Sequence, residues 1–250
     1  MVGMDKSKLI AIVDYRVDEK IIEQLNRYCS ETIKTRPLPN LMEPVNGHPD
    51  MVMMQYDDRS LIVCPEEYEY YHGKLTAQGI RVIQGTNRLS RNYPSDISYN
   101  AIRIGNTILH NGAHTDGTVV EKANDDKLLR VDVKQGYTKC SVIQLQNHGI
   151  ITADRQISEV ADSIGIDSLL VKPGHVGLNG FDYGFIGGAS GYYNGHLFLT
   201  GKLDDHPDFD AIQAFVASKG IKVVYLSNNP VYDYGTIIIL NRRKNEKGIY

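Results

Sequence analysis

The stretch DYGTIIIL, residues 233–240, is a strand-like apolar run near the end of the chain, and it decides the fold. Its β-branched residues are typical of a buried strand. The stretch LIAIVD, residues 9–14, has the same character at the other end of the chain. We expect these two strands to pair, so that the last strand completes a unit that begins at the start of the chain.

Runs like LIAIVD recur along the whole chain. They are SLIVC (60–64), NTILH (106–110), GIITAD (149–154) and HLFLTG (196–201), and equivalent residues in them lie 43 to 50 residues apart. A nearly constant period of this length is typical of a chain built from repeated supersecondary units. An ordinary α+β domain with accidental spacing is the alternative interpretation.

The second unit shows what each repeat contains. The middle run SLIVC is preceded by a strand-like segment at 50–56 and followed by a helix-like segment at 65–75 and a return strand at 80–85. Five such units around an axis would share a core and leave few exposed edges. The sequence therefore predicts an α/β class protein. It would be a five-fold pseudo-symmetric α/β propeller of ββαβ repeats within a single domain, 1–250, closed by pairing of the C-terminal strand with the N-terminal unit.

Composition excludes several functional classes. The formal net charge of −3 is not that of a nucleic-acid-binding face, and no apolar run is long enough to span a membrane. We expect no signal peptide, and the odd, widely spaced cysteines Cys29, Cys64 and Cys140 are typical of reduced thiols in the cytoplasm. The expected partner is a small-molecule ligand, with the chain a monomer or a homodimer.

The five-unit pattern, together with HPDM (48–51), GYTKCS (136–141), ITAD (151–154) and GFIGGASG (184–191), resembles the pentein superfamily of guanidino-group-modifying enzymes. This superfamily includes arginine deiminase, dimethylarginine dimethylaminohydrolase and the amidinotransferases. The resemblance implies an active site at the mouth of the central axis, built from the heads of the first strands. Aligning those heads places Asp50, Asp96, Cys140, Gly188 and Asp233 at equivalent positions.

The chemistry of this superfamily uses a cysteine at the head of the fifth unit and a histidine at the head of the third. This chain has VYDYGTIII (231–239) and GYTKC (136–140) at those places, so both catalytic positions are changed. The family's hydrolysis therefore does not transfer directly. Its carboxylates do match, because Asp50 and Asp96 are still available to hold a flat cation by charge-assisted hydrogen bonds.

Cys140 is the candidate nucleophile, displaced by two units from its position in the superfamily. The neighbouring Lys139 would favour its thiolate, and His48 would transfer protons. The alternative is a cysteine that only packs, since free cysteine is among the most buried residue types. Adjacent residues on a strand also point to opposite faces, which would separate Lys139 from Cys140.

Two functions remain open from the sequence. The first is an enzyme acting on a C–N bond of a small cationic substrate, a guanidine or an amine. The second is a binding protein that kept the axial acidic pocket without the chemistry. In either case the predicted substrate-binding residues are Asp50, Asp96, Lys139, Gly187, Gly188 and Asp233. We predict no cofactor and no metal site, because His110 and His114 flank Asn111-Gly112, a turn rather than a helix.

Overall fold

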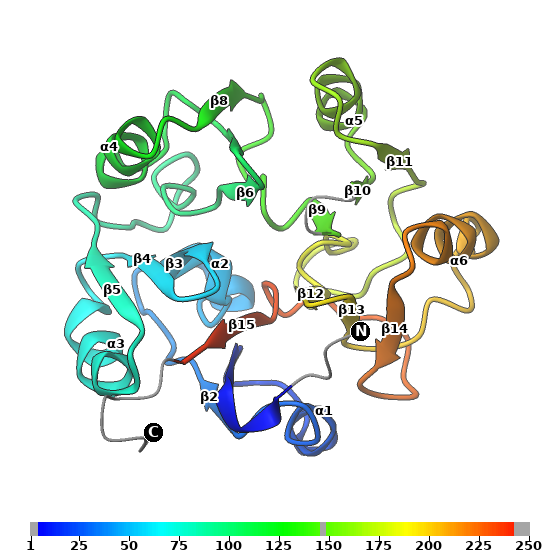
Figure 1. Cartoon of the computed structure of the whole chain (residues 1–250), viewed down its shortest axis with the longest axis horizontal. Helices are drawn as coiled ribbons and strands as arrows, with labels where there is room; N and C mark the ends of the chain where they lie inside the picture. Colours follow the sequence, from blue (N-terminus) through cyan, green and yellow to red (C-terminus); the bar gives the residue numbers. More distant parts are fainter. Residues whose placement is uncertain (1–4, 146–148, 243–250) are drawn as a thin grey trace.

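The computed structural model describes residues 5–145 and 149–242, and five three-stranded sheets surround a common axis (Figure 1). The inner strands are β3 (Met53–Asp57), β6 (Ile102–Ile104), β9 (Val142–Gln144), β12 (Ser190–Tyr193) and β15 (Ile238–Asn241). The middle strands are β1 (Leu9–Val13), β4 (Ser60–Val63), β7 (Thr107–His110), β10 (Ile150–Thr152) and β13 (His196–Leu199). The outer strands are β2 (Glu31–Lys34), β5 (Arg81–Gln84), β8 (Leu129–Asp132), β11 (Ser168–Leu170) and β14 (Lys222–Tyr225).

Every sheet has the same pairing pattern. The middle strand is antiparallel to the inner strand and parallel to the outer strand. In the closing sheet, β15 pairs with β1, with Leu9 opposite Asn241 and Ile12 opposite Ile238. The predicted pairing of the two chain ends is thus confirmed, and with it the five-fold α/β propeller.

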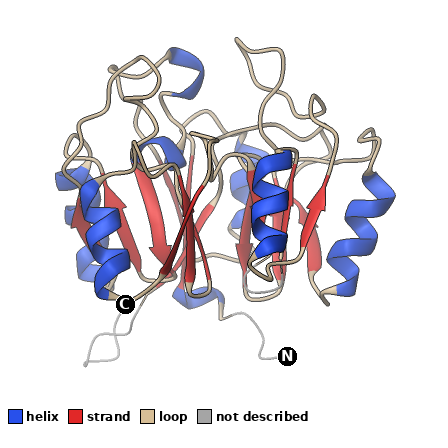
Figure 2. Cartoon of the chain, turned by 90° about the horizontal axis from the view of Figure 1, so that it is seen from above, coloured by secondary structure: helices blue, strands red, loops and turns tan. Residues whose placement is uncertain are grey.

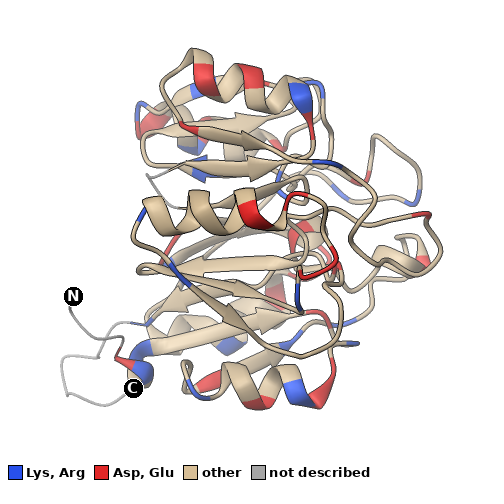
Figure 3. Cartoon of the chain, turned by 90° about the vertical axis from the view of Figure 1, so that its right-hand side faces the viewer, with Lys and Arg blue, Asp and Glu red and all other residues tan. Residues whose placement is uncertain are grey.

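A helix follows the middle strand in each unit and lies on the rim of the molecule (Figures 1 and 2). These helices are α1 (Glu19–Leu25), α3 (Tyr68–Leu75), α4 (Gly117–Asp125), α5 (Arg155–Ser163) and α6 (Phe209–Ser218), while α2 (Pro49–Val52) and the 3-10 turns η1 (Lys6–Lys8), η2 (Glu43–Val45) and η3 (Thr76–Gln78) are shorter. Apolar side chains of the middle strands are buried between the helices and the neighbouring sheets. Most charged residues lie on helices and loops rather than strands (Figure 3). Within the described part of the chain, no helix is long and apolar enough to cross a membrane.

Long connections enter the inner strands at one end of the propeller, opposite the end at which β1 begins and β15 ends (Figure 2). The predicted inner strands begin too early at this end. Asp50 lies in the one-turn helix α2, because Pro49 has the fixed φ of a first helical turn and no N–H for a strand ladder. Cys140 lies in a turn in which Ser141 N–H donates to the carbonyl of Tyr137 at 2.9 Å.

Candidate active site

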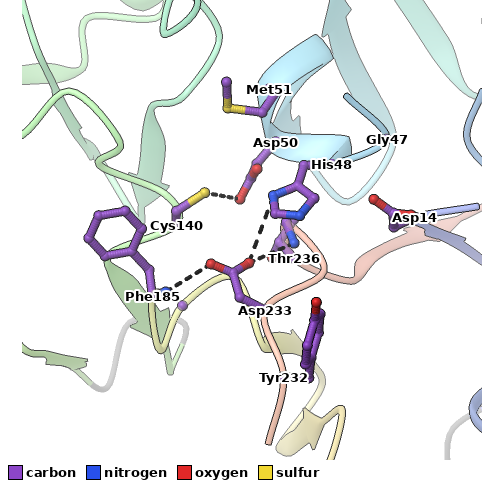
Figure 4. A network of polar contacts seen from close by, with 12 residues as sticks. Asp14, Gly47, His48, Asp50, Met51, Cys140, Phe185, Tyr232, Asp233 and Thr236 are labelled. Atoms are coloured by element: carbon purple, nitrogen blue, oxygen red, sulfur yellow. Dashed lines mark hydrogen bonds and ion pairs between the residues drawn. The ribbon is translucent and has the colours of Figure 1, made fainter. Parts of the chain in front are cut away.

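Turns from three units bring four side chains together at the head of the inner strands (Figure 4). We call His48, Asp50, Cys140 and Asp233 the axial cluster. All four are buried, with at most 3% of each residue exposed. The sequence prediction that these residues share one site agrees with this arrangement, although their predicted roles remain predictions.

The thiol of Cys140 donates to Asp50 Oδ2, with sulfur and oxygen 2.9 Å apart. Burial raises the pKa of this thiol well above its usual range, and the negative charges of Asp50 and Asp233 raise it further. The sulfur is therefore a neutral thiol in these surroundings, not the thiolate that a nucleophile needs. Since Cys140 belongs to a turn, the strand alternation expected to separate it from Lys139 does not apply.

Asp50 is a buried carboxylate with few hydrogen-bond donors. Burial raises its pKa to about 6, although the positive charge of Lys139 and the hydrogen bond from Cys140 both oppose this shift. Its Oδ1 atom has no hydrogen-bond partner among the described residues. Buried carboxylate oxygens are normally paired, so this oxygen marks a place where a ligand can donate.

Asp233 is better satisfied than Asp50. Its Oδ2 accepts from the backbone N–H of Phe185 at 2.8 Å, and its Oδ1 accepts from that of Gly235 at 2.9 Å. His48 Nδ1 lies 3.8 Å from Asp233 Oδ1, beyond hydrogen-bond length but close enough for the charge of Asp233 to act on it. Burial lowers the pKa of His48, and Asp233 opposes this effect.

Glycine is required where the turns approach one another. A Cβ at Gly188 would lie 2.0 Å from Asp233 Oδ1, and a Cβ at Gly187 would lie 2.4 Å from the backbone of Val142. The backbone N–H of Gly188 also donates to the carbonyl of Cys140 at 2.8 Å. Contacts within the protein thus explain both glycines, and the predicted contact with a ligand stays a prediction.

Asn100 is a site residue that the sequence analysis does not single out. Its Oδ1 accepts from the backbone N–H groups of Lys139 at 2.7 Å and Cys140 at 3.2 Å. Its Nδ2 donates to the carbonyl of Asp50 at 3.1 Å and lies 3.4 Å from the Cys140 sulfur. One buried amide therefore ties the Asp50 turn to the Cys140 turn, and no local sequence pattern signals such a contact.

Lys139 interacts with the axial cluster, whereas Asp96 pairs with a side chain outside it. Asp96 accepts from the hydroxyl of Tyr137 at 2.8 Å, and no hydrogen bond or ion pair to the axial cluster is found for it within the described residues. Burial lowers the pKa of Lys139, while Asp50, Cys140 and Asp233 oppose this shift. Lys139 is thus the cation that faces the negative charges of the cluster.

A pocket of about 530 Å³ runs along the axis between the five inner strands. Asp50, Lys139 and Thr236 line it at the head of the strands, and Asp57 and Asn194 line it at the opposite end. We call this space the axial pocket. His48, Cys140 and Asp233 do not line it, so a ligand at the head of the strands would contact Asp50, Lys139 and Thr236.

The sequence of the chain matches one protein family. A sequence model described as a family of unknown function (DUF6873) matches residues 12–238. No protein of curated function matches the chain significantly by sequence.

Solved structures resemble the chain over nearly its whole length. A Pseudomonas aeruginosa dimethylarginine dimethylaminohydrolase complexed with citrulline has a TM-score of 0.55 at 13% identity, covering 94% of this chain and 98% of that one. A C. jejuni agmatine deiminase variant with substrate bound has a TM-score of 0.53 at 9% identity, covering 100% and 96%. An amidinotransferase of saxitoxin biosynthesis from Microseira wollei has a TM-score of 0.52 at 10% identity, covering 95% of each chain. The chain therefore has the pentein fold of the guanidino-group-modifying enzymes, as the sequence predicted.

Proposed function

The chain belongs to DUF6873, a family of unknown function, and we propose that it is an enzyme that cleaves a C–N bond of a small guanidinium substrate. The observation that carries the proposal is the contact between a thiol and a carboxylate. Cys140 Sγ lies 2.9 Å from Asp50 Oδ2, and the other oxygen of Asp50 has no partner among the described residues. Structural neighbours that modify guanidino groups support the choice of substrate class.

Asp50 and Asp233 would hold the cation. Two carboxylates and one ammonium, that of Lys139, give the surroundings of Cys140 an excess of negative charge. A guanidinium group carries a positive charge and planar N–H donors, which match a carboxylate in geometry and charge. Its arrival would satisfy Asp50 Oδ1 and offset the negative charges of Asp50 and Asp233, which add to burial in keeping Cys140 protonated.

The cation would also activate the nucleophile. With positive charge beside the sulfur, the thiol proton passes to Asp50 Oδ2, and the resulting thiolate attacks the guanidinium carbon. An S–C bond forms, the proton moves from Asp50 to the departing nitrogen, and the C–N bond breaks to release an amine or ammonia. The product on the enzyme is a thiouronium adduct of Cys140.

Water completes the cycle. His48 would accept a proton from the attacking water and return it, and Asp233, 3.8 Å from its Nδ1, would stabilise the charged form. Addition of water to the adduct carbon and cleavage of the S–C bond regenerate the Cys140 thiol and release a urea and one proton. Asn100 would keep Cys140 and Asp50 in register during both halves, because its amide contacts both turns.

The test combines turnover with binding. The protein, kept with a metal chelator, is incubated with guanidinium, agmatine and arginine, and release of ammonia, amine and urea is measured beside the thermal midpoint. We expect product from at least one compound, loss of product in Cys140→Ser, and a thermal shift that survives in Cys140→Ser. Cys64→Ser serves as the matched control, since Cys64 is also a buried cysteine but has no hydrogen bond or ion pair to the axial cluster among the described residues, and it should keep turnover.

The outcomes separate the two functions left open by the sequence. A thermal shift without product and without a mass adduct on Cys140 would contradict the enzyme and favour a binding protein. The absence of both shift and product for every guanidine would contradict the substrate class.

A further inference from the structure

A second chemistry is available to three members of the axial cluster. One ligand atom each from His48, Asp50 and Cys140 lies within 4.8 Å of the other two, and all three residues are buried. Within residues 5–145 and 149–242, this is the only group of three or more histidine, cysteine, aspartate or glutamate side chains with that spacing. Histidine nitrogen, cysteine sulfur and carboxylate oxygen together are typical zinc ligands.

Two of these side chains carry polar atoms without a partner. His48 Nδ1 and Asp50 Oδ1 are both buried, and neither has a hydrogen-bond partner among the described residues. Two unpaired atoms in one small cluster are unusual, because buried polar groups are nearly always satisfied. They are two atoms at which an ion or ligand can complete the cluster.

We propose that His48, Asp50 and Cys140 form a binding site for a zinc-class divalent ion. Ligand atoms around a tetrahedral zinc are about 3.3–3.7 Å apart, given metal–ligand distances of about 2.0–2.3 Å. The three atoms lie within 4.8 Å of one another, so side-chain movements of about an ångström suffice to close the site. Three protein ligands leave the fourth position open.

Charge balance also favours a dication. Without metal and with a neutral thiol, Asp50 and Asp233 carry two negative charges against the single positive charge of Lys139. Metal binding displaces the thiol proton, because cysteine ligates zinc as the thiolate. Three negative charges then face Lys139 and a dication, and the group is neutral.

The metal site and the proposed enzyme make separate demands on Cys140. A metal would hold both the Cys140 sulfur and the Asp50 carboxylate, so neither would be free for the attack and proton transfer proposed above, and a metal would inhibit the guanidine reaction. The metal proposal does not rest on that reaction, and its test uses metal alone. Failure of one leaves the other standing, because turnover and guanidine binding are measured with a chelator present. If the metal binds, the prediction from the sequence that the protein has no metal site is wrong.

Cobalt reports directly on the ligands. The chain is stripped with a chelator, dialysed and titrated with Co²⁺, and the absorption spectrum is followed. We expect one Co²⁺ per chain, with a thiolate-to-metal charge-transfer band in the near ultraviolet and visible bands of a four-coordinate ion. Zn²⁺ added afterwards should bleach both sets of bands by displacement.

Variants assign the ligands. Cys140→Ser should abolish the charge-transfer band, while Cys64→Ser should keep it. His48→Gln and Asp50→Asn should each weaken Co²⁺ affinity by more than about tenfold. Mutations of residues that only hydrogen-bond to metal ligands typically already weaken affinity by about that much, and loss of a ligand itself should cost more. Asp233→Asn should weaken affinity but retain the charge-transfer band, because Asp233 lies beside His48 rather than in the ligand set.

Either of two results would overturn the proposal. One is a folded wild-type chain that takes up no Co²⁺ or Zn²⁺ in the titration. The other is a charge-transfer band that persists in Cys140→Ser, which would place the metal on another cysteine. Circular dichroism of each variant confirms that a lost band does not reflect an unfolded chain.

Discussion

Asp116 and Asp50 are both buried carboxylates, but they differ in how many hydrogen-bond donors surround them. Asp116 is fully buried, and its Oδ2 accepts from Thr86 N–H at 2.9 Å, Asn87 N–H at 2.6 Å and Tyr99 hydroxyl at 3.1 Å. These donors come from the connection after β5 and from the segment before β6. Asp116 is thus a structural carboxylate that fixes two loops to the start of α4.

Asp50 is buried to the same degree but receives only the weak donor of a thiol, and its Oδ1 is left unpaired among the described residues. Buried charge without full pairing costs stability and is retained where it serves a function. The comparison shows that this fold can supply a buried aspartate with a full set of hydrogen-bond donors, as it does for Asp116. The unpaired oxygen of Asp50 is therefore the atom at which we expect a cationic ligand to bind.

The largest expected effect is at the structural carboxylate. Asp116→Asn replaces one carboxylate oxygen, which accepts hydrogen bonds, by an amide NH₂ group, which donates them. At least one backbone N–H that now donates to Asp116 would then face another donor. We expect a loss of about 3–5 kcal/mol in the free energy of unfolding, the cost of breaking a buried charge network. Urea denaturation measures it, and a loss under about 1 kcal/mol would erase the contrast between the two sites.

A smaller effect is expected where the turns pack on the cluster. Gly188→Ala places a Cβ on Asp233 Oδ1, so we expect a loss of about 1–3 kcal/mol, as for overpacking, together with loss of guanidine binding. Gly73→Ala is the control, because nothing lies within 4 Å of its Cβ position and it lies within α3. That control should gain about 0.5–1 kcal/mol from helix propensity. Equal behaviour of the two variants would contradict the close packing at Asp233.

The smallest effect has the opposite sign. Asp50→Asn should stabilise the protein by about 1–2 kcal/mol at pH 8, because it removes a buried charge while the thiol keeps an acceptor. The pKa of Asp50 is raised on folding, to about 6, so the ionised form costs stability in the wild type as pH rises through that value. The gain should therefore shrink towards pH 4. Denaturation with a chelator present checks this, and a variant destabilised at pH 8 would mean that Asp50 is structural.

The sequence was sufficient for the architecture because the signal is local and repeated. Each middle strand is a short apolar run bounded by turn residues, and the period between runs exposed the five units. The pairing of DYGTIIIL with LIAIVD followed from that count and is present as β15 against β1. Cys140, Asp50 and Asp233 could be placed at one end because equivalent positions in repeats fall at equivalent places in space.

The details of the site were not predictable in the same way. Pro49 turns the chain before β3, and Asn100 diverts the N–H groups of Lys139 and Cys140 into side-chain hydrogen bonds. Both effects shorten the inner strands, and the second joins residues about forty positions apart. Such contacts form only when the propeller is assembled, so they cannot be predicted from any run of neighbouring residues.

The most direct test of the account is calorimetric titration of guanidine cations into the chelator-treated protein. Guanidinium, agmatine and arginine are compared on the wild type, Asp50→Asn and Asp57→Asn. Asp57 is the matched control, because it is an exposed carboxylate at the far end of the same axial pocket. If guanidine cations bind at Asp50, we expect binding to the wild type and to Asp57→Asn and no binding to Asp50→Asn. Equal binding to Asp50→Asn and the wild type would contradict the claim that the unpaired oxygen of Asp50 is reserved for a cationic ligand.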